Sequence, residues 1–286
     1  MRGLLVLAAL VAAAPAVAQT VQRSRADTIA RGRYIVETIG ACGNCHTQQR
    51  MVDGRAQTLP GLALAGGTPE DAPFGRWVAP NITPDVETGI GRWTEAQIAV
   101  ALREGKRPDG STIGPPMPFA QLRHLSDADA AAIAAYLKSI RPIRRISERS
   151  AYRMPLPPAW GPPLGQVPAP ADTPVARGEY LVNLGHCMDC HTPMLPGGRR
   201  DEARTGAGGF EMMSPNGIVV TPNITSDREH GLGAWTDAQI GRAITAGVSA
   251  DGRRLSPPMG YAFYHGMRQA DLTAITTYLR RLPPRP

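Results

Sequence analysis

The chain has 286 residues, enough for about two domains, and Lys plus Arg exceed Asp plus Glu by 31 − 24 = 7. Such a charge can attract nucleic acid, but neither an arginine cluster on a candidate reading helix nor interleaved aromatic residues accompany it, which argues against a nucleic-acid partner. Aromatic residues are only 5% of the chain, whereas glycine and proline number 31 and 28. Domains with so much loop bury little apolar surface, so we expect a large apolar group to complete each core.

Residues 1–20 are typical of a signal peptide. Arg2 precedes an apolar run from Leu4 to Ala14, and the small residues Ala16-Val17-Ala18 form a cleavage site. The alternative is a retained N-terminal anchor, but the run is too short and too rich in alanine for a good membrane span. We therefore predict an exported protein whose mature chain has no strong membrane anchor.

The chain is internally duplicated. Residues 80–117 align without a gap with residues 222–259, and 20 of the 38 positions are identical. Further upstream, "RGRY" at Arg31 matches "RGEY" at Arg177. The period is too long for a solenoid repeat, so the sequence indicates two related domains, which we place at residues 27–140 and 173–282.

The same order of elements is expected in each copy. A first helix ends at a glycine, Gly40 or Gly185, and the cysteine motif follows directly. A long loop rich in glycine and proline leads to a short helix with a capping box, and a final helix closes the copy. The final helices are expected to carry an apolar stripe, made of Ile133, Tyr136, Leu137 and Ile140 in the first copy and of Leu272, Ile275, Tyr278 and Leu279 in the second. No strand pattern is convincing, so we predict a mainly α fold. The expected helix caps are Asp27 or Thr28, Thr94, Ser126, Thr173 and Thr236.

Between the copies lies a proline-rich segment, residues 141–172. Pro155 to Pro174 contains eight prolines in twenty residues. This composition favours polyproline II geometry, so we expect a semi-rigid linker.

All four cysteines lie in two matching motifs, "CGNCH" at 42–46 and "CMDCH" at 187–191. The C-x-x-C-H spacing is typical of c-type haem attachment, in which two thiols form thioethers with the porphyrin vinyl groups and the histidine binds the iron. The sequence therefore predicts two covalently bound haem c groups. The first is held by Cys42, Cys45 and His46, and the second by Cys187, Cys190 and His191.

Three other interpretations of the motifs fit the sequence less well. A zinc site needs four ligands, whereas one motif offers three. A thioredoxin-like pair needs a βαβ context, and two disulfides would leave both histidines without a role. A haem also supplies the apolar bulk that the composition lacks.

Met117 and Met259 are the candidate sixth ligands. They follow their histidines by 71 and 68 residues, and two prolines precede each of them. Proline fixes φ, so such a loop can present a thioether sulfur rigidly, and His/Met ligation raises the reduction potential of haem iron. The rivals are His124 and His265, which we expect at the surface. Asn81 and Asn223 either donate hydrogen bonds to haem propionates or brace their own loops.

Taken together, the paired C-x-x-C-H motifs, "PNIT", "G-x-G-x-W-T-x-A-Q-I", "DG" and "PPM" resemble the cytochrome c subunits of bacterial periplasmic alcohol, gluconate and sorbitol dehydrogenases and of some molybdenum hydroxylases. The resemblance implies a class I cytochrome c fold in each domain and two His/Met haems. It implies a periplasmic chain that passes electrons from a dehydrogenase catalytic subunit of flavin, quinoprotein or molybdenum type to quinone or another cytochrome. Several such subunits have a third haem domain with a membrane-binding segment, whereas this chain ends after its second copy, so we expect no membrane attachment of that kind.

The leading hypothesis is thus electron transfer by two haems with no catalytic activity of the chain's own. Two alternatives remain open at this stage. A dihaem peroxidase or thiosulfate-oxidising enzyme would need an iron with an open position, which the matched methionines disfavour. A free-standing shuttle between respiratory complexes would need no dehydrogenase partner.

Overall fold

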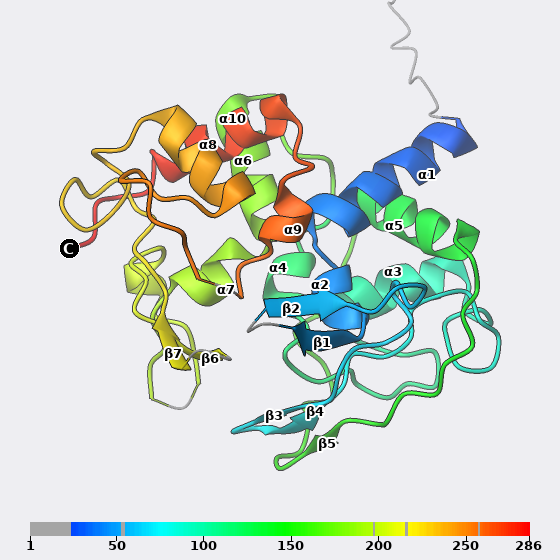
Figure 1. The fold of residues 1–286 in the computed structure, drawn as a ribbon. Helices are drawn as coiled ribbons and strands as arrows, with labels where there is room; N and C mark the ends of the chain where they lie inside the picture. The colour runs from blue at the N-terminus through cyan, green and yellow to red at the C-terminus, as the bar shows by residue number, and fades with distance from the viewer. Residues whose placement is uncertain (1–23, 53–54, 197, 215–216, 257) are drawn as a thin grey trace, which may run out of the picture.

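A computed structural model describes residues 24–286 except 53–54, 197, 215–216 and 257. The predicted signal peptide lies outside the described residues. Helices dominate, and they gather into two halves with the same order of elements (Figure 1). The helices of the first half are α1 (Arg25–Tyr34), η1 (Ile35–Ile39), α2 (Gly43–His46), α3 (Glu95–Glu104), α4 (Phe119–Leu122) and α5 (Asp127–Ser139). Those of the second half are α6 (Pro174–Leu184), α7 (Cys187–His191), η2 (Glu202–Arg204), α8 (Asp237–Ala246), α9 (Tyr261–Tyr264) and α10 (Gln269–Leu279).

Four of the five predicted helix caps are confirmed, namely Thr94, Ser126, Thr173 and Thr236. Both capping boxes form, because Thr94 and Thr236 accept hydrogen bonds from glutamine amides three residues on while the glutamine side chains bond back. Ser126 and Thr173 also accept bonds from the first turns of α5 and α6. These side chains satisfy amide groups that would otherwise lack partners.

The predicted cap of the first helix is wrong. Ser24, rather than Asp27 or Thr28, is the N-cap of α1, and its hydroxyl accepts from the backbone N–H of Asp27. Asp27 lies instead in the first turn, where its carboxylate interacts favourably with the positive end of the helix dipole. Asp27 therefore still stabilises the helix start, from a position inside the helix.

Each half is built on one close helix crossing. α1 packs against α5 at Gly32, where an added Cβ would lie 1.9 Å from the carbonyl oxygen of Ala132. α6 packs against α10 in the same way at Gly178, with 2.0 Å to the carbonyl oxygen of Ala274. No side chain fits between these backbones, so the glycine of each "RG-Y" segment is what permits the crossing.

The apolar core is continuous across the halves. One cluster of buried side chains includes Ile35 and Ile39 from η1 together with Leu181 and Leu184 from α6. Ile133, Tyr136 and Leu137 of the predicted stripe on the last helix are buried in it, as are Ile275 and Leu279 of the second stripe. The two last helices thus bury the faces that the sequence predicts.

The expectation of no strands is wrong in detail. The described residues include short antiparallel strands, none longer than four residues: β1 (Gln49–Val52), β2 (Arg55–Thr58), β3 (Glu70–Ala72), β4 (Gly75–Trp77), β5 (Ala151–Tyr152), β6 (Glu211–Ser214) and β7 (Gly217–Val220). β1 pairs with β2, β6 with β7, and β4 lies between β3 and β5. Strands this short give too few alternations for a period of two to be read from the sequence.

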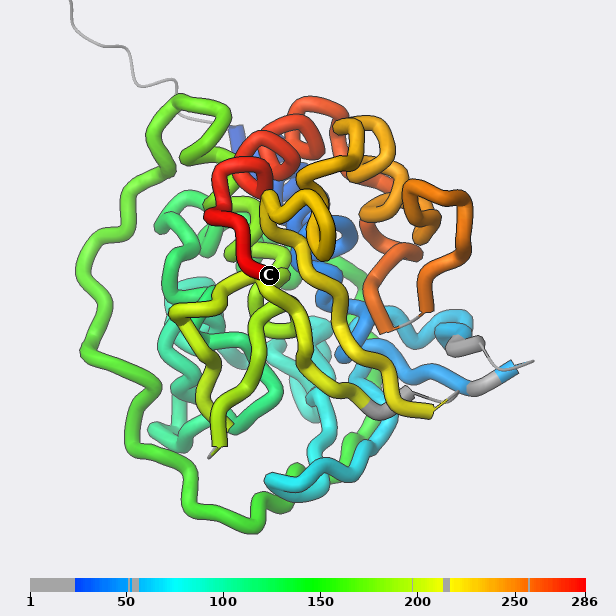
Figure 2. Tube along the Cα trace, turned by 90° about the vertical axis from the view of Figure 1, so that its left-hand side faces the viewer, coloured from blue at the N-terminus to red at the C-terminus, as the bar shows by residue number. Residues whose placement is uncertain are grey.

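The proline-rich segment 141–172 runs along the outside of the first half (Figure 2). β5, which lies within it, pairs with β4 and so extends the small sheet. Farther on, Val167 and Asp127 exchange hydrogen bonds at the start of α5. The segment is therefore attached to the first half at several points along its length.

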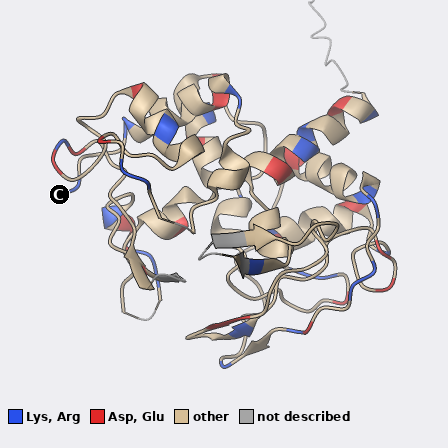
Figure 3. Ribbon diagram, in the orientation of Figure 1, with Lys and Arg blue, Asp and Glu red and all other residues tan. Residues whose placement is uncertain are grey.

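Charges of both signs are interspersed over the two halves in the view of Figure 3. Among the described residues, none of the helices has the length and apolar character that crossing a bilayer requires.

Candidate haem centres

Each C-x-x-C-H motif lies on a single helical turn. The chain leaves the preceding helix through a residue with a left-handed backbone, Ala41 with φ 44° and His186 with φ 43°. α7 then carries the whole second motif, whereas α2 carries the first from Gly43 onward with Cys42 as its N-cap. One turn brings both thiols and the histidine to the same short element, as attachment to one edge of a porphyrin requires.

The two histidines are oriented identically by backbone carbonyl groups. Nδ1 of His46 lies 2.8 Å from the carbonyl oxygen of Pro80, and Nδ1 of His191 lies 2.8 Å from that of Pro222. A carbonyl oxygen only accepts, so Nδ1 is the donor and Nε2 is left without a proton, as an iron ligand must be.

Burial keeps both imidazoles in the neutral form. Both rings lie in the core, and desolvation lowers the pKa of His46 and His191 against the opposing effect of the hydrogen bond to the proline carbonyl. A neutral imidazole with an available Nε2 beside two thiols fits the donor set of haem c in both halves.

The asparagines of the "PNIT" segments brace their loops. The Asn81 side chain donates to the carbonyl of Ile143 at 2.8 Å and accepts from the amide of Thr83 at 2.9 Å. Asn223 repeats this with the carbonyl of Arg285 at 2.5 Å and the amide of Thr225 at 2.8 Å. Of the two roles that the sequence left open, the structure supports loop bracing. The brace holds the loop whose proline carbonyl orients the histidine.

Residues that sequence reasoning missed complete this support. Thr47 and Thr192 follow the histidines and accept hydrogen bonds from the amides of Leu64 and Gly206 at 3.0 and 3.3 Å. The proline carbonyls were missed as well. The prolines and threonines are identical in the two copies, and this identity is the sequence feature that could have pointed to them. It does not indicate a carbonyl contact, because every residue has a backbone carbonyl.

Met117 and Met259 lie at equivalent places on the loops before α4 and α9. Each is partly buried, and its carbonyl accepts from the amide two residues on at 2.9 Å in both halves. Met117 also packs against the apolar core. His124 and His265, the rival ligands, are exposed, which confirms the prediction that they lie at the surface.

Desolvation acts on the thiols of both motifs. It raises the pKa of Cys42 and of Cys187 to about 12 and that of Cys45 to about 11. Among the described residues, no three His, Cys, Asp or Glu side chains form a group that could hold a metal ion.

The two motifs approach each other at the contact between the halves. Cys190 is close enough to Cys45 to contribute to the rise of its pKa. The buried Tyr264 lies near cysteines of both motifs, and its pKa is raised first by burial and then by Cys187, Cys190 and Cys45. Thiols of the two motifs therefore influence each other's ionisation across the contact between the halves.

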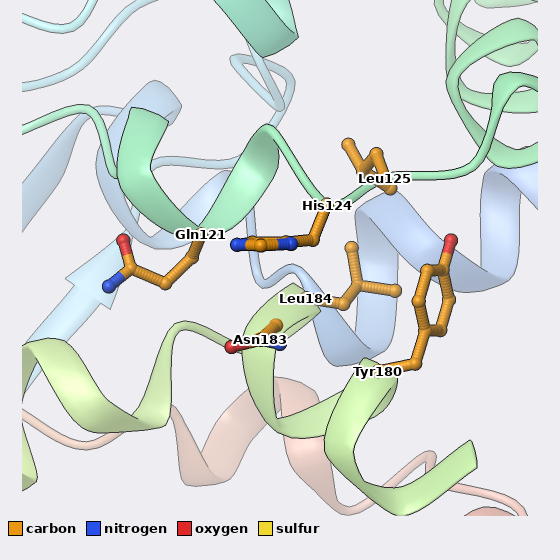
Figure 4. A pocket seen from close by; sticks show the side chains of 6 residues that line it. All are labelled: Gln121, His124, Leu125, Tyr180, Asn183 and Leu184. Carbon is orange, nitrogen blue, oxygen red and sulfur yellow. The ribbon is translucent and has the colours of Figure 1, made fainter. Parts of the chain in front are cut away.

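Each motif also packs on the short helix of the other half. A Cβ at Gly43 in the first motif would lie 3.0 Å from the ring of Phe263, which belongs to α9. At the equivalent place in α4, Gln121 acts on Asp189 of the second motif, where it opposes the rise that burial causes in the pKa of that carboxyl. Figure 4 shows this side of the contact, with the α4 turn lying across α6 at Asn183.

Reciprocal hydrogen bonds join the halves. The hydroxyl of Tyr34 donates to Asp271 and that of Tyr180 donates to Asp129, both at 2.7 Å. Both aspartates are buried, and each also pairs with an arginine of its own half, Asp129 with Arg31 and Asp271 with Arg177. Contacts that pair equivalent residues in both directions are those of a two-fold interface, here within one chain.

Comparison with known proteins agrees with this geometry. The family model for cytochrome c matches residues 29–141. A diheme cytochrome c-type protein of Cereibacter sphaeroides is 32% identical over 256 residues, covering 85% of this chain and 82% of that protein. The chain belongs to the cytochrome c family, whose members bind haem c covalently.

Longer relatives match over most of this chain. The cytochrome c subunit of the quinone alcohol dehydrogenase of Gluconobacter oxydans is 33% identical, covering 90% of this chain and 55% of that protein. The cytochrome c subunit of gluconate 2-dehydrogenase of Pantoea cypripedii is 30% identical, covering 89% of this chain and 59% of that protein. The chain spans only part of these dehydrogenase subunits.

Proposed function

We propose that the chain is a periplasmic dihaem cytochrome c that transfers electrons from a dehydrogenase catalytic subunit to a respiratory acceptor, either quinone or another cytochrome. The observation that carries the proposal is the repeated histidine geometry, in which Nδ1 donates to a proline carbonyl in both halves and Nε2 is the ring nitrogen that would bind iron. Two such sites in one chain are what a dihaem protein needs.

In this proposal each half is a class I cytochrome c domain, residues 27–140 and 173–282, joined by segment 141–172 and exported by a signal peptide at 1–20. Bound haem supplies iron that alternates between the ferric and ferrous states. Cys42, Cys45 and His46 hold the first group with Met117 as sixth ligand. Cys187, Cys190 and His191 hold the second with Met259. A soft thioether favours the ferrous state and so raises the potential.

The contact between the halves supports electron passage from one centre to the other. The first motif packs at Gly43 on the ring of Phe263 of the other half. Tyr264, the buried neighbour of Phe263 in α9, donates to the carbonyl of Gly185 beside the second motif at 3.5 Å. The reciprocal tyrosine–aspartate bonds hold this placement, because breaking either one leaves a buried carboxylate with one partner fewer.

The dehydrogenase partner is inferred from relatives. Those named as cytochrome c subunits of alcohol and gluconate dehydrogenases match this chain over about nine tenths of its length. A cytochrome with both axial positions filled has no site for substrate, so we propose that catalysis belongs to a separate subunit and that this chain only carries electrons.

Purification of the full chain from the periplasm tests the proposal. A pyridine haemochrome assay is expected to give two haems per chain, and the ferric spectrum is expected to be low-spin at both. A tagged chain is expected to retain a dehydrogenase subunit and to be reduced when the substrate of that enzyme is added. A high-spin ferric centre in the resting protein would instead indicate a peroxidase-like enzyme, and one haem per chain would contradict the proposal.

A further inference from the structure

The proline-rich segment 141–172, called the strap from here on, contacts one loop of the first half repeatedly. This loop, residues 105–118, carries Met117 and is called the Met117 loop. The strap meets it through two aromatic residues, Tyr152 and Trp160. A segment that served only to join two domains would not need such contacts.

Tyr152 contacts the loop at Gly114 and at Pro115, the first of the two prolines. Its hydroxyl donates to the carbonyl of Pro115 at 2.9 Å, and its ring lies so close to Gly114 that a Cβ there would be 2.3 Å from the ring. Pairing of β5 with β4 fixes the Tyr152 backbone, and the ring of Phe74 stacks on its ring with centroids 6.4 Å apart. The tyrosine is thus anchored to the sheet and bonded to the loop two residues before Met117.

Trp160 holds the loop on the other side of the same turn. Its indole N–H donates to the carbonyl of Ile113 at 2.7 Å. Its ring stacks on Phe119, with centroids 5.7 Å apart and an interplanar angle of 21°. Phe119 lies two residues after Met117, so the strap bonds and packs on both sides of the methionine.

The second copy differs where the strap makes these contacts. Ser256 stands at the position of Gly114, and Tyr261 at that of Phe119. A side chain at the Gly114 position would collide with the Tyr152 ring, so the first copy alone has the space for that ring. The contacts therefore suit the first loop specifically.

We propose that Tyr152 and Trp160 are positioning residues that hold the Met117 loop in place, so that the strap stabilises thioether ligation at the first haem centre. This inference rests on the proposed function, in which Met117 is a ligand. The loop exchanges between a closed form, with sulfur at the iron, and an open form. An added ligand binds only the open form, so its apparent affinity reports the fraction of open loop.

The test uses the ferric holoprotein and imidazole as the competing ligand. Tyr152→Phe and Trp160→Phe each remove one hydrogen bond and keep an aromatic ring for packing. Each is expected to raise the imidazole affinity of the first centre by about tenfold or somewhat less, since one lost bond changes the loop equilibrium by that order. The affinity of the second centre is expected to stay unchanged.

Two further variants make the result unambiguous. Tyr136→Phe removes a buried hydroxyl of the same half that bonds Glu37 and not the loop, so it controls for general destabilisation. Met117→Ala identifies which titration phase belongs to the first centre. If the two strap variants bind imidazole at the first centre no more tightly than Tyr136→Phe does, the strap inference is overturned and the proposed function is not affected. A Met117→Ala protein with both phases unchanged overturns the proposed ligand as well.

The reduction potential gives a second readout. An open loop loses the ferrous-favouring thioether, so the strap variants are expected to lower the potential of the first centre and leave the second where it was. A fall in both potentials, or in neither, contradicts the inference.

Discussion

The two halves agree in what surrounds the histidines and differ in what surrounds the methionines. Both use a proline carbonyl at Nδ1, an asparagine brace and a glycine crossing. Only the first loop receives Tyr152 and Trp160 from the strap among the described contacts. The shared features are those that a haem-binding fold needs. The features that differ can give the two similar centres different ligand affinities and reduction potentials.

The largest effect is expected from removing one pair of thiols. Cys42→Ser/Cys45→Ser and Cys187→Ser/Cys190→Ser are each expected to lose one covalent haem, because the serine oxygens cannot form the thioethers. The haemochrome absorbance per chain should fall by about half in either variant. A chain that kept its full absorbance would show that the altered motif is not an attachment site.

The glycine crossings should be equally sensitive in the two halves. In Gly32→Ala and Gly178→Ala, the new methyl group meets a backbone carbonyl, which cannot move without separating the helices. We expect each to lower the free energy of unfolding by about 2–3 kcal/mol, measured by denaturant titration. Gly165→Ala is the matched control, since nothing lies within 4 Å of a Cβ there. If only one of the two glycine variants lowered the free energy of unfolding, the two helix crossings would not be structurally equivalent.

The reciprocal tyrosines should also behave alike. Tyr34→Phe and Tyr180→Phe each remove one donor from a buried aspartate that keeps its arginine, so a loss of about 1–2 kcal/mol in the free energy of unfolding is expected. If these bonds also fix the placement of the two centres, both variants are expected to change the separation of the two reduction potentials. Tyr136→Phe, whose bond to Glu37 lies within one half, should leave that separation unchanged.

The smallest effect concerns two equivalent loop aspartates. The pKa of Asp85 is held low first by the Thr88 hydroxyl, whereas that of Asp227 is held low first by the backbone N–H of His230. Carboxylates with a lowered folded-state pKa stabilise the fold above their unfolded pKa, about 3.9, and lose this stabilisation as the pH falls through the folded value. Thr88→Val is therefore expected to raise the pKa of Asp85 in an NMR titration more than His230→Val raises that of Asp227.

Local chemistry made much of the fold predictable. Threonine and serine caps, the terminal glycines and the apolar stripes depend on neighbours in the sequence, and they were found where expected. The strands were too short to show a period, and the "RG-Y" segments revealed only that the copies are related. Their tyrosines bond aspartates as far as 237 residues away, which no local pattern reports.

The candidate centres divide in the same way. Spacing alone identified the cysteines, histidines and methionines as candidates, because that chemistry depends on side-chain type. The proline carbonyls that orient the histidines carry no such signature, since every residue has a carbonyl. The role of the strap was hidden because a proline-rich composition predicts stiffness but not the surface on which the segment lies.

The shared apolar cluster has a consequence for how the molecule unfolds. Side chains of η1 and α6 belong to one buried apolar cluster, so neither half has a complete interior by itself. Denaturation should then be a single cooperative transition, because unfolding of one half exposes the apolar side chains of the other half to water. Expressed alone, either half would present a sticky apolar face and tend to aggregate.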